Sequence, residues 1–287
     1  MSKEIAHHQA EAVLTDVDCT LLNSRRQLSN LSLATIEHYL REQQNNHNLP
    51  RLALCTARHP AALINTVLPV FTKNAPDSVH IVCDGAMLID AQAKVISQEA
   101  FSSAIIKQIC QDVESLGGSF SFGFQDAFYC GEDFLRERSQ GAELIKFLPY
   151  SAIAEHDDWT TTLIIINHLN EAVEKYTQSL QNEFNFHLSK LVSTFNHQAY
   201  YNLTLPNISK VKGVEKWLEH YQLSSDKLIM IGDGMNDLEV MANSIGVAVA
   251  NAQPEVKEQA RLILDKSNDE DAVAWFLNEI LSLSVPT

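Results

Sequence analysis

The stretch Leu14-Thr15-Asp16-Val17-Asp18-Cys19-Thr20 continues an apolar run that begins at Ala12. This run predicts a short buried β-strand over residues 12–15, followed directly by acidic residues. Residues two apart in an extended chain point to the same side, so we expect Asp16 and Asp18 to lie together at the carboxyl end of the strand. Open α/β sheets bind their ligands at this edge. The alternative interpretation is an ordinary polar turn that closes a strand.

The rest of the chain alternates between strand-like and helix-like segments in three blocks. The first block predicts strands over 12–15, 52–55 and 79–83, a helix over 31–43 and a second helix opening near Pro60. The middle block has longer connections, with strands predicted over 119–124, 128–130, 144–148 and 161–166, helices over 101–116 and 168–182, and strand-like runs at 185–204. The first rhythm then returns, with helices over 209–221, 236–242 and 270–283 and strands over 228–231, 246–249 and 261–264.

This organisation predicts an α/β fold with two domains. Alternating strands and helices at both ends of the chain favour a Rossmann-like parallel sheet with helices on both faces. We expect residues 1–86 and 205–287 to form this domain, and residues 87–204 to form an α+β domain inserted into it.

The composition excludes several classes of protein. The chain has 287 residues, of which 45% are apolar, and 36 acidic against 21 basic residues give a net charge of −15. This length allows one large or two smaller globular domains, and the negative charge disfavours nucleic acid and anionic membranes as partners. There is no apolar leader at the start and no apolar run that would span a bilayer. The 5 cysteines have no C-x-x-C spacing and are expected to be free thiols, so we expect a cytoplasmic protein.

A second acidic motif, Ile231-Gly232-Asp233-Gly234-Met235-Asn236-Asp237, also follows an apolar run. Carboxyl ends of parallel strands meet at one sheet edge, so Asp233 and Asp237 are expected near Asp16 and Asp18. Four carboxylates together are destabilising without a hard divalent cation, and oxygen ligands with an incomplete shell suit Mg²⁺. The alternative is a Gly-Asp turn that caps the following helix.

Two further segments offer groups that bind anions. Leu54-Cys55-Thr56-Ala57-Arg58 ends a predicted strand, and a hydroxyl with backbone N–H groups entering a helix is a phosphate-binding arrangement; a simple Thr56 helix cap is the alternative. Lys210 opens an amphipathic helix, where a cation is unfavourable unless an anion or carboxylate lies beside it. A solvated lysine is the alternative there.

In this order, the motifs resemble those of the haloacid dehalogenase superfamily. Residues 16–22 resemble D-x-D-G-T-L-L, residues 55–58 resemble its T-G-R segment, residues 82–86 look like its N-G-A segment, and residues 232–237 match G-D-G-x-N-D. Residues 246–252 and 267–273 continue the likeness. The long segment between the second and third motifs is similar to the α+β cap of the Cof-type phosphatases in this superfamily.

The resemblance implies a Mg²⁺-dependent phosphatase that acts on a small phosphorylated metabolite, either a sugar phosphate or a cofactor phosphate. It implies that Asp16 attacks phosphorus to form an aspartyl-phosphate, and that Asp18 protonates the leaving oxygen and later deprotonates water. The phosphoryl group would be held by Thr56, Ala57, Lys210 and Asn236. The metal would be held by Asp16, Asp233 and the backbone carbonyl of Asp18, supported by Asp237.

The motifs depart from the family pattern at several positions. Cys19 and Ala57 stand where the family has glycine, and Asp84 stands where it has asparagine. Lys210 fits the family spacing without a gap, whereas Lys212 keeps the glycine that follows. None of these departures removes a reacting group. A phosphomutase, or a phosphate- or metal-binding module that has lost turnover, are the alternatives to a phosphatase.

Substrate selectivity is expected to come from the inserted domain. Its aromatic and basic side chains are the candidate contacts: Phe122, Phe124, Tyr129, Arg136, Arg138 and Lys146. For each of them we favour a structural interpretation, because aromatic side chains in strands are usually core and charged stretches are usually solvated.

Overall fold

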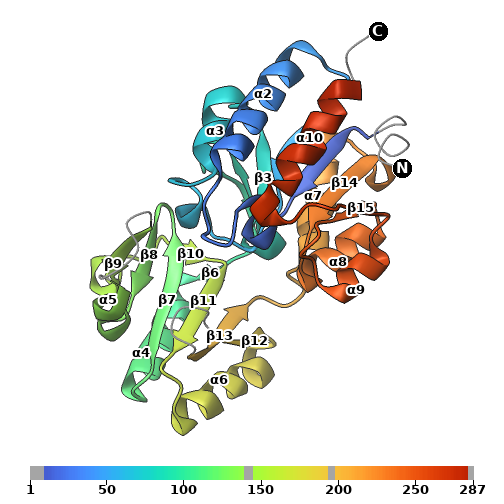
Figure 1. Cartoon of the computed structure of the whole chain (residues 1–287). Helices are drawn as coiled ribbons and strands as arrows, with labels where there is room; N and C mark the ends of the chain where they lie inside the picture. The colour runs from blue at the N-terminus through green and yellow to red at the C-terminus, as the bar shows by residue number, and fades with distance from the viewer. Residues whose placement is uncertain (1–9, 139–144, 193–197, 284–287) are drawn as a thin grey trace. The chain divides into compact units, whose positions relative to one another are not determined.

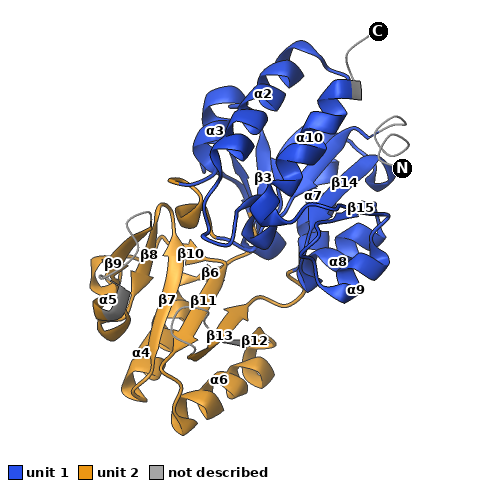
Figure 2. Cartoon of the chain, in the orientation of Figure 1, with its two compact units in different colours: residues 1–58, 66–97, 209–287 blue, residues 59–65, 98–208 orange. Residues whose placement is uncertain are grey.

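The computed structural model describes residues 10–138, 145–192 and 198–283 of the chain. These residues fall into two compact units (Figure 2), unit 1 with residues 1–58, 66–97 and 209–287, and unit 2 with residues 59–65 and 98–208. The insertion predicted at 87–204 thus overlaps most of unit 2, and its limits stay a prediction. No helix in the described part of the chain is long and apolar enough to cross a membrane.

Unit 1 contains a five-stranded parallel sheet in the order β16-β15-β14-β1-β2 (Figure 1). Its strands are β1 (Ala12–Thr15), β2 (Arg51–Leu54), β14 (Leu228–Gly232), β15 (Ile245–Ala248) and β16 (Leu262–Ile263). In the central pairs, β1 lies between β14 and β2, with Ala12 opposite both Leu228 and Arg51. All residues of β1, β14 and β15 are buried, which explains their continuous apolar runs. The predicted α/β fold with a parallel sheet is confirmed.

The helices of unit 1 form two groups. In one group α2 (Asn30–Asn45) packs against both α3 (Leu68–Asn74) and α10 (Ala272–Leu283); in the other, α8 (Met235–Ala242) packs against both α7 (Lys210–Tyr221) and α9 (Pro254–Gln259). The connection after β1 leads to β2 on one side of the central pair, whereas the connection after β14 leads to β15 on the other side. Because such crossovers are right-handed, the two groups cover opposite faces. The carboxyl ends of β1 and β14 therefore lie at the point where the strand order reverses, which is a preferred ligand-binding position.

Two features of the first 100 residues differ from the sequence-based expectation. The helix expected near Pro60 is limited to one 3₁₀ turn, Pro60–Ala62. The Ala61 N–H of this turn donates to His59 Nδ1 at 3.2 Å. After β3 (Val79–Val82) the chain forms β4 (Met87–Asp90) and β5 (Val95–Gln98), which make a three-stranded sheet with β3. This hairpin was not predicted, because its short strands follow the Asp84-Gly85 turn without a helix between them.

Unit 2 is built on a six-stranded sheet in the order β12-β13-β11-β7-β8-β9. Its strands are β7 (Ser119–Phe124), β8 (Ala127–Cys130), β9 (Lys146–Pro149), β11 (Leu163–Asn167), β12 (His187–Val192) and β13 (Ala199–Thr204). Pairing is antiparallel except between β8 and β9. The helices α4 (Ser103–Ser115) and α6 (Glu171–Phe184) share a core with alternate residues of β7, β11 and β13, so both helices pack on one face of the sheet. Leu144, part of the strand predicted at 144–148, lies outside the described residues.

A short two-stranded sheet, β6 (Phe101–Ser102) with β10 (Thr160–Thr161), completes unit 2.

Several candidate substrate contacts of the middle block have structural roles in unit 2. Phe122 is fully buried in the core, and Phe124 and Tyr129 pack against it. Lys146 pairs with Asp126 at 3.2 Å. In α5 (Glu132–Arg138), Arg136 pairs with two acidic residues of the same helix, and nothing is described for the side chain of Arg138.

Candidate active site

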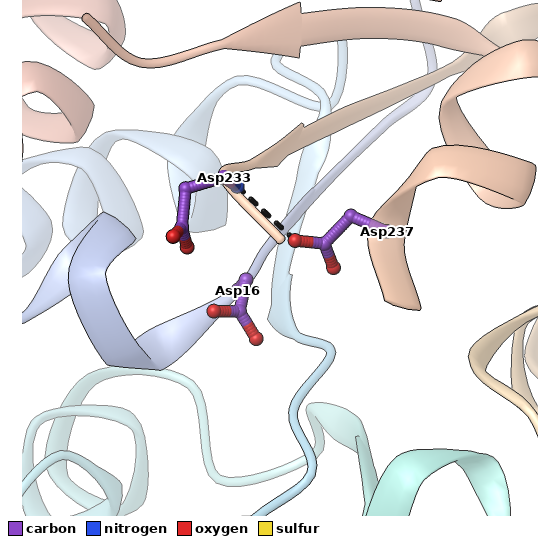
Figure 3. A group of neighbouring side chains, drawn as sticks. All are labelled: Asp16, Asp233 and Asp237. Atoms are coloured by element: carbon purple, nitrogen blue, oxygen red, sulfur yellow. Dashed lines mark hydrogen bonds between the residues drawn. The ribbon is translucent and has the colours of Figure 1, made fainter. Parts of the chain in front are cut away.

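Three carboxylates meet at the carboxyl ends of β1 and β14 (Figure 3). Asp16 follows β1, Asp233 follows β14 and Asp237 lies in the first turn of α8. Each offers an oxygen atom, and these atoms all lie within 4.8 Å of one another. The Asp16 N–H donates to the Ile231 carbonyl at 2.8 Å, which extends the β1–β14 pairing to the start of both loops. The sequence-predicted sheet edge therefore brings together three of the four acidic residues assigned to it.

Lys210 lies beside these carboxylates. It is the first residue of α7, and its side chain is fully buried. Its Nζ donates to Asp16 Oδ1 at 2.5 Å and to Asp237 Oδ1 at 2.6 Å. Lys212, the other candidate lysine, is about half exposed and pairs with Glu215 at 2.9 Å. The ammonium that contacts the acidic group is therefore that of Lys210.

Glycine allows α7 to begin this close to the site. Gly85 has φ +95°, and a Cβ there would lie 2.0 Å from the Ser209 carbonyl oxygen. Gly213, one turn into α7, faces Gly85, because a Cβ added to Gly213 would lie 2.5 Å from Gly85 Cα. Both positions exclude a side chain, so the start of α7 can pack directly on the turn after β3. This packing places Lys210 among the carboxylates.

Asp237 is the most constrained of the three acidic residues. Its Oδ1 accepts the Lys210 ammonium, and its Oδ2 accepts the backbone N–H groups of Asp233 and Gly234, each at 3.1 Å. The dashed line in Figure 3 marks the first of these N–H bonds. Asp237 thus anchors the lysine and shapes the turn after β14. Its expected part in holding the metal stays a prediction.

The donor set fits a hard divalent cation. Within the described part of the chain, Asp16 Oδ2 and Asp233 Oδ2 accept no hydrogen bond, so both oxygens are available to bind a cation. With Lys210, the three carboxylates carry a formal charge of −2 that a divalent cation would neutralise. Carboxylate oxygens with an incomplete shell are ligands that Mg²⁺ accepts. Asp16 and Asp233 are therefore the residues best suited to hold it.

The electrostatics of the group follow from its burial. Burial raises the pKa of Asp16 to about 8, although the Lys210 ammonium opposes the shift. Burial likewise raises the pKa of Asp233 to about 6, against the hydrogen bond from Thr20. Burial also disfavours the charged form of Lys210, but Asp16 and Asp237 outweigh it and hold the Lys210 pKa well above its ordinary value. The site retains protons that a bound cation would displace.

Asp18 does not join this group, contrary to the expectation of four neighbouring carboxylates. The strand ends at Thr15, and the backbone leaves the extended conformation at Val17, although Asp18 itself is extended (φ −75°, ψ 134°), so the same-side rule for strands does not apply. Arg58 instead binds the Asp18 carboxylate with both ends of its guanidinium, Nε to Oδ2 at 2.7 Å and Nη2 to Oδ1 at 2.6 Å. Burial raises the Asp18 pKa, but the hydrogen bonds and charge of Arg58 outweigh it, and the pKa is lowered.

Of the predicted phosphate-binding residues, Thr56 and Ala57 lie in the loop after β2, and Asn236 lies in the first turn of α8. Thr56 is buried directly after β2, and its Oγ1 accepts the Arg58 N–H at 3.1 Å, so it closes a turn and not a helix. Ala57 is exposed in the same turn. Asn236 Nδ2 donates to Asp84 Oδ1 at 2.9 Å. Asp84, which stands where the family has asparagine, therefore orients the amide of Asn236.

Sequence reasoning missed two polar contacts at the site. Arg58 was part of a recognised motif, but its pairing with Asp18 depends on the fold of two separate loops. Thr20 Oγ1 donates to Asp233 Oδ1 at 2.9 Å and links the two acidic loops. Its place in the first motif was the only available signal.

The comparisons with known proteins agree with this geometry. A model of the haloacid dehalogenase-like hydrolases matches residues 13–277. The chain therefore belongs to the haloacid dehalogenase-like hydrolase family, and the resemblance predicted from the motifs is confirmed.

Relatives and solved structures extend the comparison over most of the chain. Pyridoxal phosphate phosphatase YbhA of Escherichia coli is 25% identical over 294 aligned residues, covering 92% of this chain and 96% of its own. A phosphoglycolate phosphatase of Methanopyrus kandleri is 39% identical over 82 residues, covering 28% of this chain and 35% of its own. A haloacid dehalogenase-like hydrolase from Bacteroides thetaiotaomicron has the same fold, with a TM-score of 0.77, 18% identity, and coverage of 95% of this chain and 100% of its own.

Proposed function

We propose that the chain is a Mg²⁺-dependent phosphatase that hydrolyses a small phosphorylated metabolite through an aspartyl-phosphate on Asp16. The observation that carries the proposal is the buried Asp16 carboxylate, which has Lys210 on one oxygen and no hydrogen-bond partner among the described residues on the other. A carboxylate in this position can act as a nucleophile, while the ammonium balances charge on the phosphoryl group. Membership of a hydrolase family supports the same reaction.

In the first step, Asp16 Oδ2 attacks phosphorus, and the bond from phosphorus to the leaving oxygen breaks. Asp18 gives its proton to that oxygen. Lys210, the Thr56 hydroxyl, the Ala57 N–H and Asn236 hold the phosphoryl oxygens. Asp16, Asp233 and the backbone carbonyl of Asp18 would hold Mg²⁺, which would supply positive charge to the phosphoryl oxygens.

In the second step, water attacks the phosphorus of the aspartyl-phosphate, and Asp18 accepts the proton of the water. Inorganic phosphate leaves and the Asp16 carboxylate is restored. Arg58 keeps Asp18 ionised in this structure, which is the state the second step needs. The first step needs protonated Asp18, so Arg58 has to release the carboxylate when the substrate arrives.

A cofactor phosphate is the substrate class to test first, because a pyridoxal phosphate phosphatase is similar to this chain over nearly its whole length. Sugar phosphates are the second class. We also propose a cytoplasmic location without nucleic-acid or membrane partners. The five free cysteines and the net charge of −15 support this.

The proposal is tested by measuring phosphate release from p-nitrophenyl phosphate, pyridoxal 5′-phosphate and a panel of sugar phosphates, with Mg²⁺ and with EDTA. We expect Mg²⁺-dependent release that Asp16→Asn abolishes. Asp77→Asn is the matched control, because Asp77 is an exposed aspartate just before the amino end of β3, whereas Asp16 follows the carboxyl end of β1. Its activity should equal that of the unmodified chain.

Absence of release from every compound would contradict the phosphatase proposal. An isomerised sugar phosphate without net phosphate release would indicate a phosphomutase. Binding of Mg²⁺ and phosphate without turnover, measured by calorimetry, would indicate a binding module.

A further inference from the structure

The turn that carries Asp18 holds a residue in a strained conformation. Cys19 has φ +56° and ψ +9°, in the left-handed region that glycine adopts freely and that costs energy for a residue with a Cβ. The neighbours of Cys19 in this turn are functional, since Asp18 precedes it and Thr20, which donates to Asp233, follows it. The surrounding structure must therefore stabilise this conformation.

Two asparagine side chains bind the turn. Asn251 Nδ2 donates to the Cys19 carbonyl at 2.7 Å. Asn251 Oδ1 accepts the Asn268 N–H at 2.8 Å, and Asn268 Nδ2 donates to the Leu22 carbonyl at 3.0 Å. The two amides thus bind the turn at Cys19, its strained residue, and at Leu22, just past its end.

The segment around Asn251 is also bonded to the second acidic loop. The Val249 N–H donates to the Gly232 carbonyl at 3.3 Å, and the Gln253 N–H donates to the Asp233 carbonyl at 3.0 Å. Residues 249–253 therefore hydrogen-bond to both loops that carry the carboxylates. A rigid connection of this kind sets the relative position of the two loops.

We propose that Asn251 is a positioning residue that holds the left-handed turn at Cys19 and, through it, Asp18 and the Thr20–Asp233 hydrogen bond. This inference rests on the proposed function where it concerns activity. Because Cys19 occupies a position where a residue without a Cβ would be unstrained, the contribution of Asn251 depends on the side chain at residue 19. This dependence is the part of the proposal that can be measured.

The test is a double-mutant cycle. Asn251→Ala removes both side-chain hydrogen bonds, and Asn251→Asp removes the donor to Cys19 but keeps an acceptor for Asn268. Each is made in the natural chain and in Cys19→Gly, which relieves the left-handed strain. Asn45→Asp is the matched control, since Asn45 is an exposed asparagine in α2 whose Nδ2 donates to the Arg41 carbonyl at 3.1 Å.

For the natural chain we expect Asn251→Asp, which loses one neutral hydrogen bond, to lower kcat about five- to tenfold, and Asn251→Ala, which loses two, to lower it at least as much, with KM changed less than about twofold in both. In Cys19→Gly the same substitutions should lower kcat by less than about twofold. A thermal unfolding cycle gives a second readout that needs no activity. The Asn251 variants should lower Tm by about 2–4 °C in the natural chain and by clearly less in Cys19→Gly.

Equal losses in both backgrounds, in kcat and in Tm, would overturn the proposal, because Asn251 would then not act through residue 19. A loss confined to Asn251→Asp would also overturn it, since the cause would be the added charge. If the natural chain releases no phosphate, the proposed function fails, and the Tm cycle alone decides whether Asn251 holds the turn.

Discussion

Replacing Lys210 by methionine removes the ammonium of the site but keeps an unbranched apolar side chain of similar length. In the structure, this ammonium donates to both Asp16 and Asp237, and the Lys210 side chain is fully buried. The Asp237 side chain is also fully buried, so water cannot replace the lost partner. The variant therefore leaves buried carboxylates without their cation.

Removing one partner of a buried ion pair costs about 3–5 kcal/mol, because the remaining charge is buried without compensation. For a domain of this size, such a loss lowers Tm by about 6–20 °C. Lys212→Met is the matched control two residues further along α7. Lys212 is about half exposed, and exposed pairs such as Lys212–Glu215 contribute about 0–1 kcal/mol.

The loss in Lys210→Met should grow at alkaline pH. The pKa of folded Asp16, about 8, lies above its ordinary value of 3.8, so folded Asp16 keeps a proton that the unfolded chain releases, and stability falls as pH rises between these values. Lys210 lowers the pKa of folded Asp16, so removing the lysine raises the pKa of Asp16 further. The contribution of Asp16 to this loss of stability therefore ends above about pH 8 in the unmodified chain, whereas in the variant it continues to higher pH.

The assay is urea unfolding followed by circular dichroism at pH 7 and pH 9, together with phosphate release. We expect Lys210→Met to be the less stable variant at both values, with the larger deficit at pH 9, and to lose about 100-fold or more in kcat. Equal stability of Lys210→Met and Lys212→Met, or a deficit that shrinks at pH 9, would refute the reasoning.

Three further predictions concern the site and its supporting structure. Arg58→Ala removes the hydrogen bonds and the charge that lower the pKa of Asp18, so this pKa should rise, and the alkaline limb of the pH–rate profile, where the acid is lost, should move to higher pH; an unshifted profile would contradict the Arg58–Asp18 pairing. Gly85→Ala should destabilise the chain by about 2–4 kcal/mol in urea unfolding, since its Cβ would lie 2.0 Å from a backbone oxygen at a positive φ; unchanged stability would show that α7 does not pack as described. Burial lowers the pKa of His80 to about 3 from 6.5, so the unfolded chain binds more protons between these values, and stability rises by about 1.4 kcal/mol for each unit that pH rises. His80→Asn keeps an acceptor for the Leu54 N–H but cannot titrate in this range, so its stability should lose this pH dependence when unfolding is compared at pH 5 and pH 7. The same change of stability with pH in the variant and the unmodified chain would contradict this assignment.

The parallel sheet and the strand ends of the site were predictable from local sequence. Buried strands of a parallel sheet need continuous apolar runs, and the runs at β1 and β14 end directly before Asp16 and Asp233. Lys210 was also predictable, because a cation at a helix start needs a nearby anion and its position fits the family spacing.

The pairing of Asp18 with Arg58 was not predictable in this way. It depends on the departure from extended backbone at Val17, between Asp16 and Asp18, and on contact with a loop 40 residues away. The hairpin of β4 and β5 was missed for a similar reason. Its strands are short, and the pairing of a hairpin with β3 is a tertiary choice that apolar periodicity does not specify.

The most direct test of the account is to identify the residue that is phosphorylated during turnover. The protein is mixed with substrate and Mg²⁺, quenched in acid within one turnover, and its peptides are analysed by mass spectrometry. We predict a phosphoryl group on the peptide that contains Asp16, with none in Asp16→Asn treated in the same way. Continued phosphate release with no phosphorylated peptide, or with the phosphoryl group on another residue, would contradict the assignment of Asp16 as the nucleophile.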